Sequence, residues 1–401
     1  MPGAEKIKQL ASRYFKEVQA IRHHLHSHPE LSFKEFRTSD YIAAQLQAKG
    51  IAFTRGHAGT GIVATIQGQD PARDVVLLRA DMDALPIQEK STAAYASCVP
   101  GVMHACGHDV HSACMLGAAF ILNETKNDWQ GTVKIMFQPG EEVLPGGASL
   151  MIKEGVLHNP EVSKALALHV YPSMPAGRAG FRPGMYMAST DELYITVNGK
   201  GGHAAMPADY INPLLIASEL LLKINDTFMK PGALKGTAGE TIPTVVAFGK
   251  IEGRGATNVV PQTVELAGTM RTMNEDWRAE IKRRLADIVK NVSDQYGIES
   301  QLRIEHGYPF LVNNEPFTDS CSALAQQYLG RENVEDLPLR MTAEDFAFIT
   351  QQVPSCFFRL GTAGPDNTFR SGVHTPTFDI HETALETGMG LMAWLAVNAV
   401  K

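Results

Sequence analysis

The segment MHACGHDVH, residues 103–111, concentrates side chains that can bind a metal ion. A thiolate and an imidazole spaced as Cys106-x-His108 can face one ion from a turn, and Gly107 allows the tight bend. Any one of these histidines could instead be a buried structural residue, and the aspartate could simply cap a helix. The cluster as a whole predicts a metal site, with its polar members at His104, Cys106, His108, Asp109 and His111.

The segment QPGEE, residues 138–142, places Glu141 and Glu142 side by side directly after an apolar run. Adjacent carboxylates repel each other, and on a surface they would splay into water. At the end of a strand that faces a Cys/His cluster, one can bind the metal while the other accepts a proton from water. A metal lowers the pKa of its water from about 15.7 toward about 7, so a glutamate is a competent base.

Further candidates follow other apolar runs. Asp81 and Asp83 in RADMDALP could orient a ligand or bind the metal, or they could cap a turn. His169 ends ALALHVY, and His374 precedes Pro376 in a late loop. Alone, each of these histidines could be structural. Counted with Cys106, His108 and one glutamate, they give five ligands, enough for two ions bridged by water.

Alternating apolar runs and helical patterns must position these residues. The helices expected in this part are Ala4–Ala20, Thr38–Lys49, Ser112–Leu122, Ala148–Glu154 and Phe317–Leu329. The strands expected are 61–68, 74–81, 131–139, 164–171 and 355–361. Buried strands separated by helices predict an α/β domain with a sheet that is at least partly parallel and an active site at strand ends.

From about residue 190 the pattern changes to β-α-β-β-α-β, with helices at Pro213–Lys223 and Asp276–Tyr296. We interpret this as an inserted α+β domain at 189–307 within a catalytic domain formed by 1–188 and 308–401.

Composition excludes several classes of protein. The chain has 401 residues, 44% hydrophobic and 20% charged, as in a globular protein. The net charge of −7 opposes nucleic acid binding. No apolar run reaches the roughly 18 residues of a membrane span, and the amphipathic start lacks a signal-peptide core, so we expect a cytoplasmic protein without membrane contact. Five scattered cysteines do not indicate a disulfide framework.

The motifs together resemble the M20 metallopeptidase superfamily, in its amidohydrolase branch of hippurate hydrolases, N-acyl amino acid hydrolases and auxin-conjugate hydrolases. The resemblance spans nearly the whole chain. It rests on RHHLHSHPELSFKE, RADMDALP, GVMHACGHDVH, FQPGEE, LALHVYP, GKGGHAAMP, GRGATNVVPQTVELAGTMR, TAEDFAF and GVHTPTF. The superfamily has His-x-Asp where this chain has Asp81-Met82-Asp83, and a bridging Asp where it has Cys106; both departures are typical of the branch.

The resemblance implies a mixed-sheet catalytic domain that holds two divalent ions, of Zn, Mn, Co or Ni. The implied ligands are Cys106, which would bridge the two ions, and His108, Glu142, His169 and His374. Glu141 would be the general base, and Asp83 would orient a ligand. The inserted domain would be a lid that forms a homodimer or a higher oligomer.

Three residues of the inserted domain are also implied. His203 would stabilise the oxyanion, often in the partner subunit's active site, and Asn258 and Arg271 would hold the acyl amino acid. Without the resemblance, Asn258 and Arg271 would be an ordinary turn residue and a solvated strand residue. Ala208 stands where many relatives have a second histidine.

The expected reaction is hydrolysis of an N-acyl amino acid to a carboxylate and a free amino acid. Three alternatives remain: a dinuclear dipeptidase, a binding protein with a structural metal, and a thiol enzyme that uses Cys106. The sequence alone names neither the acyl group nor the native metal.

Overall fold

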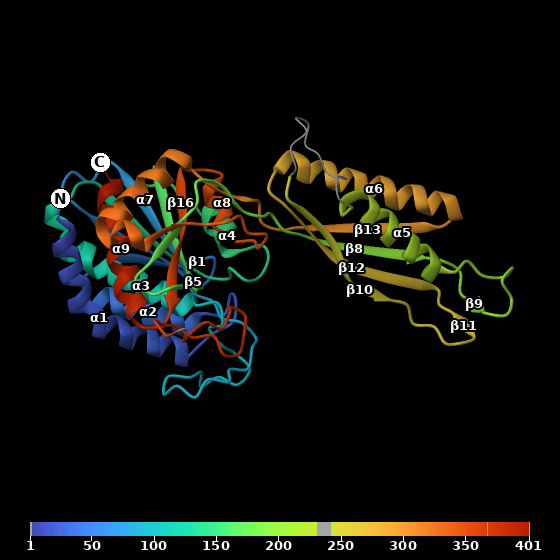
Figure 1. Cartoon of the computed structure of the whole chain (residues 1–401), viewed down its shortest axis with the longest axis horizontal. Helices are drawn as coiled ribbons and strands as arrows, with labels where there is room; N and C mark the ends of the chain where they lie inside the picture. The colour runs from blue at the N-terminus through green and yellow to red at the C-terminus, as the bar shows by residue number, and fades with distance from the viewer. Residues whose placement is uncertain (1, 231–241, 367, 401) are drawn as a thin grey trace. The chain divides into compact units, whose positions relative to one another are not determined.

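A computed structural model describes residues 2–230, 242–366 and 368–400 (Figure 1). The chain divides into two compact units. The first contains the residues up to Gly184, Val312–Pro338, and Asp345 onward, and the second contains Met185–Leu311 and Leu339–Glu344. The second unit therefore interrupts the first in sequence. Each unit has its own hydrophobic core.

An eight-stranded mixed sheet forms the centre of the first unit, in the order β1-β2-β4-β3-β5-β16-β6-β15. The four middle strands, β4, β3, β5 and β16, run parallel, and β3, β4 and β16 are buried along their whole length. Such strands need cover on both faces. The bounds are β1 (Ala52–His57), β2 (Gly61–Gln67), β3 (Val75–Asp81), β4 (Thr132–Gln138), β5 (Lys164–Pro175), β6 (Ala179–Phe181), β15 (Val334–Asp336) and β16 (Ser355–Ala363).

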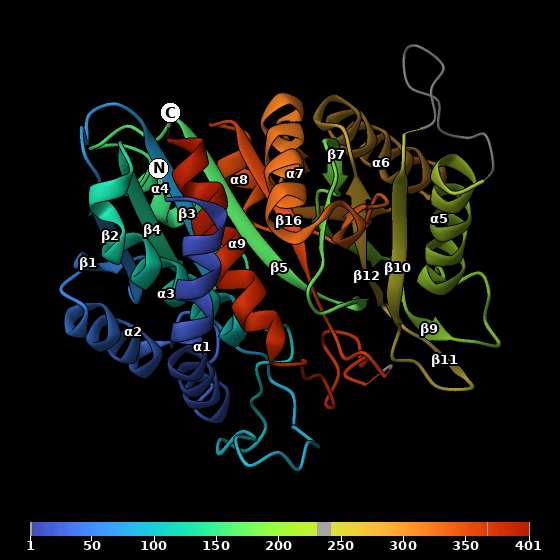
Figure 2. The ribbon, with the colours of Figure 1, turned by 60° about the vertical axis from the view of Figure 1, so that its left-hand side comes forward.

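Helices α1, α3 and α9 pack together against one face of this sheet (Figure 2). Helix α3 is buried nearly all round, as is α9. The helices of the first unit are α1 (Ala4–Ser27), α2 (Phe36–Ala48), α3 (His108–Glu124), α4 (Gly147–Lys153), α7 (Glu315–Leu329), α8 (Ala347–Thr350) and α9 (Thr383–Ala399).

Some expected helix bounds are wrong, and one helix was not predicted. Helix α1 does not end at Ala20 but continues to Ser27, because polar residues of its last turns find partners inside the protein. Helix α3 begins at His108 instead of Ser112. Helix α9 was not expected, because a helix that is apolar on every side lacks the one-sided pattern that identifies a surface helix.

The register of the parallel strands brings the predicted site residues to one edge. Asp81, the last residue of β3, lies opposite Gln138, the last residue of β4. Arg79 lies opposite Ala167 of β5, which places His169 at the level of Asp81. The turn with the two glutamates leaves β4 at this same edge.

The second unit is an antiparallel sheet in the order β10-β12-β8-β13, with α5 and α6 on one face (Figure 1). The strands and helices follow the order expected from the sequence, with an added two-stranded ribbon of β9 and β11. Their bounds are β8 (Asp191–Asn198), β9 (Gly202–His203), α5 (Pro213–Phe228), β10 (Thr244–Glu252), β11 (Val259–Val260), β12 (Thr263–Thr272), α6 (Glu275–Tyr296) and β13 (Glu299–His306). Within the described ranges, no helix has the length and apolar character needed to cross a membrane.

Candidate metal centre

Two groups of three potential metal ligands share the thiol of Cys106. One group is Cys106, His108 and His169, and the other is Cys106, Glu142 and His374. Within each group the ligand atoms all lie within 4.8 Å of one another. All five ligands predicted from the sequence therefore meet at one place in the first unit.

The spacing of the ligand atoms suits metal binding. The Sγ of Cys106 lies 3.5 Å from Nε2 of His169, and Nε2 of His374 lies 3.1 Å from Oε1 of Glu142. Bonds of about 2.0 to 2.3 Å at tetrahedral angles would separate two ligand atoms by roughly 3.3 to 3.8 Å. His108 lies between the two glutamates, with Nε2 4.0 Å from both Oε1 of Glu142 and Oε2 of Glu141.

The turn that presents Cys106 and His108 depends on Gly107. This glycine has a φ of +85°, in the left-handed region, and a Cβ there would lie 2.6 Å from the side chain of Val170. A larger residue would be strained and would also clash with β5. His108 is the first residue of α3, so its ring is fixed by both the turn and the helix.

Asp83 contacts one member of each group. Its Oδ1 lies 3.1 Å from Nδ1 of His108, and its Oδ2 accepts hydrogen bonds from the backbone N–H of Glu142 at 3.0 Å and from Ser32 Oγ at 2.7 Å. Burial alone would raise the pKa of Asp83, but the hydrogen bond and charge of His108 outweigh it, and the pKa is lowered. An ionised Asp83 holds a proton on Nδ1 of His108, leaving Nε2 as the metal-binding atom.

The Nε2 atom of His108 is buried and has no hydrogen-bond partner among the described residues. An unpaired nitrogen in a buried ring is costly, whereas a metal ion would satisfy it. In His169, as in His108, Nδ1 has a protein partner and Nε2 faces the candidate site. Its Nδ1 lies 2.9 Å from the carbonyl oxygen of Val170, and its Nε2 points to the thiol of Cys106.

His374 reaches the site from a loop. Its backbone adopts a φ of +62°, which is strained for a residue with a side chain, and its backbone N–H donates to the carbonyl of Ala105 at 2.7 Å. The side chain is 51% exposed, so this side of the site is open to solvent.

The protonation states of the ligands show how a cation would fit. Burial and the charge of Glu142 raise the pKa of the Cys106 thiol. Hydrogen bonds to Cys106 and Glu142 raise the pKa of His374 to about 10. Without a metal, the Cys106 thiol and the His374 imidazole therefore keep their protons. A bound divalent ion would replace these protons and stabilise the thiolate and the neutral imidazole. The sulfur, nitrogen and oxygen donors suit Zn, Mn, Co or Ni, and the residues present fit two such ions.

Asp81 and His111 form another such group with His108, but the ligand atoms of Asp81 and His111 already have partners in the protein. Asp81 accepts a hydrogen bond from Arg79 at 2.6 Å and lies 2.6 Å from Nδ1 of His111. The Nε2 of His111 accepts the backbone N–H of Val170 at 3.0 Å. Both ring nitrogens of His111 are therefore occupied, and Asp81 shares the guanidinium of Arg79 with Asp345.

The remaining polar residues of the 103–111 segment face the interior. The alternative that Asp109 caps the helix is wrong, because the N-cap position is Gly107 and the Asp109 carboxylate accepts from Arg22 instead. His104 is buried, and neither of its ring nitrogens has a hydrogen-bond partner in the described part of the chain. The sequence alone could not distinguish these residues from ligands.

Glu35 supports the turn that carries the two glutamates. This fully buried carboxylate accepts hydrogen bonds from the backbone N–H groups of Gly140 and Phe33, each at 2.9 Å, and from Thr60 Oγ1 at 2.8 Å. The Phe33 ring covers Gly140, where a Cβ would lie 2.4 Å from it. Burial, followed by the charge of Asp83, raises the pKa of Glu35 to about 7.

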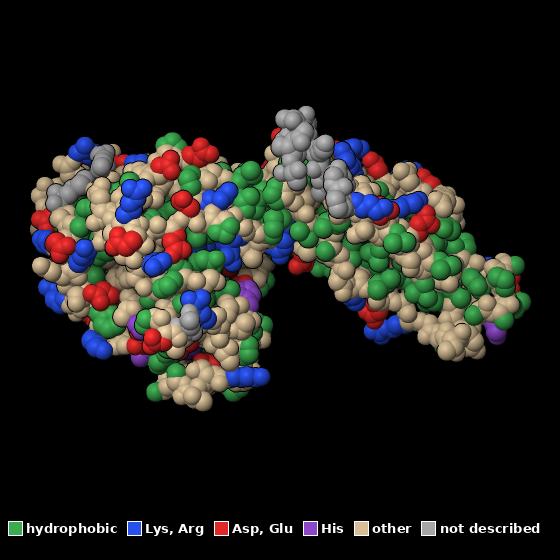
Figure 3. Space-filling view, viewed as in Figure 1, with side chains coloured by type: hydrophobic (Ala, Val, Ile, Leu, Met, Phe, Trp, Pro, Cys, Tyr) green, Lys and Arg blue, Asp and Glu red, His purple; other side chains and the backbone are tan. Residues whose placement is uncertain are grey.

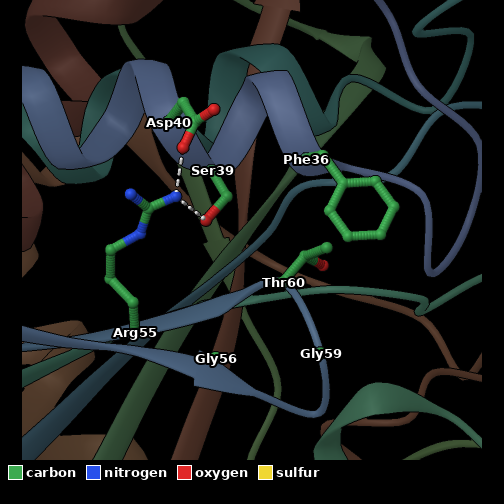
Figure 4. Close-up of a pocket in the computed structure, with 7 residues that line it drawn as sticks. All are labelled: Phe36, Ser39, Asp40, Arg55, Gly56, Gly59 and Thr60. Carbon is green, nitrogen blue, oxygen red and sulfur yellow. Dashed lines mark hydrogen bonds and ion pairs between the residues drawn. The ribbon is translucent and has the colours of Figure 1, made fainter.

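A pocket of about 280 Å³ is lined by Thr60 and by residues of α2, β1 and the turn after β1 (Figure 4). Arg55 crosses it and donates to Asp40 and to Ser39. None of the predicted ligands lines this pocket, so it is separate from the metal centre. Its lining residues are Phe36, Ser39, Asp40, Arg55, Gly56, Gly59 and Thr60.

The three predicted substrate residues lie in the second unit. His203 in β9 is exposed, and its Nδ1 accepts the backbone N–H of Ala205. Asn258 is exposed. Its backbone carbonyl accepts a hydrogen bond from the backbone N–H of Ala204, the residue that follows His203. Arg271 in β12 is half-buried, and this burial lowers its pKa.

Comparison with known proteins agrees with this site. Residues 77–398 match the model of peptidase family M20/M25/M40. The chain is 37% identical over 309 residues to an N-acyl-L-amino acid amidohydrolase of Geobacillus stearothermophilus, covering 77% of this chain and 81% of the relative. It is 34% identical over 370 residues to the N-acetyl-L-cysteine deacetylase of Bacillus subtilis, covering 92% and 85%.

A solved structure is also similar. The YXEP protein of Bacillus subtilis, described as a dinuclear metal binding peptidase from the M20 family, superposes with a TM-score of 0.80. It is 29% identical and covers 97% of this chain and 99% of its own. The fold, the ligand cluster and these relatives define a metal-dependent amidohydrolase. The chain belongs to peptidase family M20/M25/M40.

Proposed function

We propose that this enzyme hydrolyses N-acyl amino acids at a centre of two divalent ions. The observation that carries the proposal is the sharing of the Cys106 thiol between two groups of three ligands, with the carboxylate of Glu141 beside them. The relatives named for acting on N-acyl amino acids and on N-acetylcysteine support this class of substrate.

The residues of the chain divide the work of the reaction. When bound, divalent ions supply a Lewis acid that polarises the amide carbonyl and lowers the pKa of water. The oxygen of the water molecule attacks the carbonyl carbon, and Glu141 accepts a proton from that water molecule. Glu141 then returns this proton to the amide nitrogen, the C–N bond breaks, and a carboxylate and a free amino acid leave.

In this proposal Glu142 remains a ligand throughout, because Asp83 fixes its backbone N–H and His374 lies against its Oε1. Asp83 is a positioning residue and does not exchange protons with the substrate. These contacts assign Glu142 the role of ligand and leave the role of base to Glu141 in the proposal.

Residues of the second unit complete the proposal. His203 donates to the oxyanion of the tetrahedral intermediate. Arg271 binds the carboxylate of the acyl amino acid, since a guanidinium pairs with a carboxylate through two hydrogen bonds, and Asn258 assists it. The second unit acts as lid and as the contact surface of a homodimer. The cytoplasmic location expected from the sequence stays a prediction.

The test uses protein stripped of metal by chelation and reloaded separately with Zn²⁺, Mn²⁺, Co²⁺ or Ni²⁺. We expect turnover of N-acetyl and N-benzoyl amino acids only after reloading, and little turnover of dipeptides with a free α-amine. Full activity of the stripped protein would indicate a thiol enzyme. Preference for dipeptides would establish a dipeptidase. If the reloaded protein hydrolysed none of these amides, the result would favour a binding protein with a structural metal.

A further inference from the structure

Arg22 is a fully buried arginine that joins two carboxylates from distant parts of the chain. Its Nε donates to Oδ2 of Asp109 at 2.8 Å, and its Nη2 donates to Oδ1 of Asp379 at 2.7 Å. It lies in the part of α1 beyond Ala20, within the motif RHHLHSHPELSFKE, to which the reaction assigns no role.

The two carboxylates lie next to two of the segments that provide candidate metal ligands. Asp109 directly follows His108 in the first turn of α3. Asp379 lies on the segment between His374 and α9. The Arg22 guanidinium therefore links the loop of Cys106 and His108 to the loop of His374. Another link is the backbone hydrogen bond from His374 to Ala105.

Neighbouring groups fix this arginine in place. Its guanidinium lies 4.7 Å from the centre of the Tyr95 ring, and the Tyr95 hydroxyl donates to Oδ2 of Asp379 at 2.9 Å. The Nδ1 of His26 lies 2.8 Å from Oδ2 of Asp109. The planar guanidinium donates its hydrogen bonds in fixed directions. It therefore fixes both the orientation of the two carboxylates and the distance between them.

Stability alone is a weak explanation for this arrangement. Removing charged groups from water is costly, and well-packed apolar residues often replace buried ion pairs without loss of stability. A fixed geometry is what an arginine between two carboxylates offers and an apolar cluster does not. The need for such geometry is evident here, because His374 sits on an exposed loop with a strained backbone.

We propose that Arg22 is a positioning residue that holds the His374 loop against the Cys106 loop and thereby sets the affinity of the ion bound by Cys106, Glu142 and His374. The proposal rests on the two-ion centre described above. The ion bound by Cys106, His108 and His169 depends less on Arg22, since His108 is also held by Asp83 and His169 by the carbonyl oxygen of Val170.

The experiment measures Zn²⁺ binding to the metal-free full-length chain by competition with a chromophoric chelator. The variants are Asp379→Asn and Arg22→Lys, with folding checked by circular dichroism. The matched control is Arg278→Lys, since Arg278 is also a buried arginine held by carboxylates, those of Asp191 and Glu275, but lies in the second unit.

We expect the wild type to bind two Zn²⁺ ions. In both variants one ion should bind with unchanged affinity and the other about 10- to 100-fold more weakly, the usual effect of losing a residue that orients a ligand. Arg278→Lys should bind both ions normally. If Arg22→Lys does not fold, Asp379→Asn decides, since it keeps the size of the side chain and the Arg22 to Asp109 contact.

Two results would overturn the role of Arg22: unchanged affinity for both ions in the folded variants, or equal weakening of both ions. Neither result would affect the proposed function. Failure of the wild type to bind two Zn²⁺ ions would instead refute the two-ion centre itself. The two failures are therefore distinguishable in a single set of titrations.

Discussion

A thiolate sulfur has several lone pairs, and Cys106 uses its position between two ligand groups to contact both. The other four ligands each belong to one of these two groups. Loss of a peripheral ligand should therefore affect mainly one ion, whereas loss of the thiol should affect both. The buried residue with the largest influence on metal content is expected to be Cys106.

Replacing Cys106 by Ala should release both ions, because each group retains only two ligands. Metal content of the purified protein, measured by elemental analysis, checks this. The control is Cys114→Ala. Cys114 is also a buried thiol, but it lies in α3 and contacts the carbonyl of Leu385 instead of the ligands. Wild-type metal content in Cys106→Ala would exclude the thiolate as a ligand.

Replacing Glu141 by Gln should leave both ions bound and lower kcat by about 10²- to 10⁴-fold, the usual contribution of a general base. The amide keeps the size of the side chain but cannot accept the proton. Turnover and metal content are measured on the same sample, with the exposed Glu161 replaced by Gln as control. Normal turnover with both ions bound would contradict the assignment of the base.

At the scale of elements, loops at one edge of the sheet carry the ligands, and buried polar residues hold these loops. Glu35 anchors the turn at Gly140, and Asp83 anchors the same turn two residues later, at Glu142. A carboxylate is well suited to this task, since it accepts several backbone hydrogen bonds at once. Its burial has a cost that depends on pH.

Replacing Glu35 by Gln should change how stability depends on pH. The folded-state pKa of about 7 exceeds the ordinary 4.5, so the folded protein holds this proton more tightly than the unfolded chain. The contribution of this proton to the free energy of unfolding is complete below about pH 4.5. It is lost as the pH rises through about 7, and the free energy of unfolding then falls by up to about 3 kcal/mol.

Urea unfolding of the metal-free protein between pH 4.5 and 8 measures this effect as the difference between wild type and variant. The difference should vary with pH for Glu35→Gln and stay constant for Glu299→Gln, whose carboxylate is exposed. A constant difference for Glu35→Gln would show that Glu35 keeps its ordinary pKa in the folded protein.

The sequence predicted most strands of the central sheet and all five residues that gather at the metal centre. Glu142 and His169 come at the ends of apolar runs, and parallel strands end at a common edge, so local patterns indicated their position. The choice of Glu142 over Glu141 as the ligand rested on the family resemblance. The position of Asp109 was not predictable, because its partner Arg22 lies far away in sequence and the same residue type often caps helices. Helix α9 was missed because its burial on all sides hides the helical period.

At the scale of the molecule, the second unit carries an exposed apolar surface. Leu215 and Leu222 on the outer side of α5 are 67% and 65% exposed. Figure 3 shows apolar side chains gathered on the part of the second unit that carries α5. Apolar patches of this kind often mark contacts between proteins. This surface suits the proposed homodimer.

Replacing both Leu215 and Leu222 by Glu should convert the proposed dimer to a monomer, because two charges would be buried at the contact. Sedimentation velocity across a range of concentrations measures the assembly state. Phe36→Glu is the control, since Phe36 is 61% exposed but lies in the first unit. An unchanged dimer in the double variant would locate the contact elsewhere, and a monomeric wild type would refute the dimer.

His374 follows the inserted unit in the chain, whereas the other four ligands precede it. During synthesis, the ribosome must therefore complete the whole insertion before the group of Cys106, Glu142 and His374 can assemble. A nascent chain that has emerged only as far as His169 already has four ligands but cannot close that second group. Hydrolytic activity should consequently begin only after the insertion has been translated, so that an unfinished chain is not an active amidase.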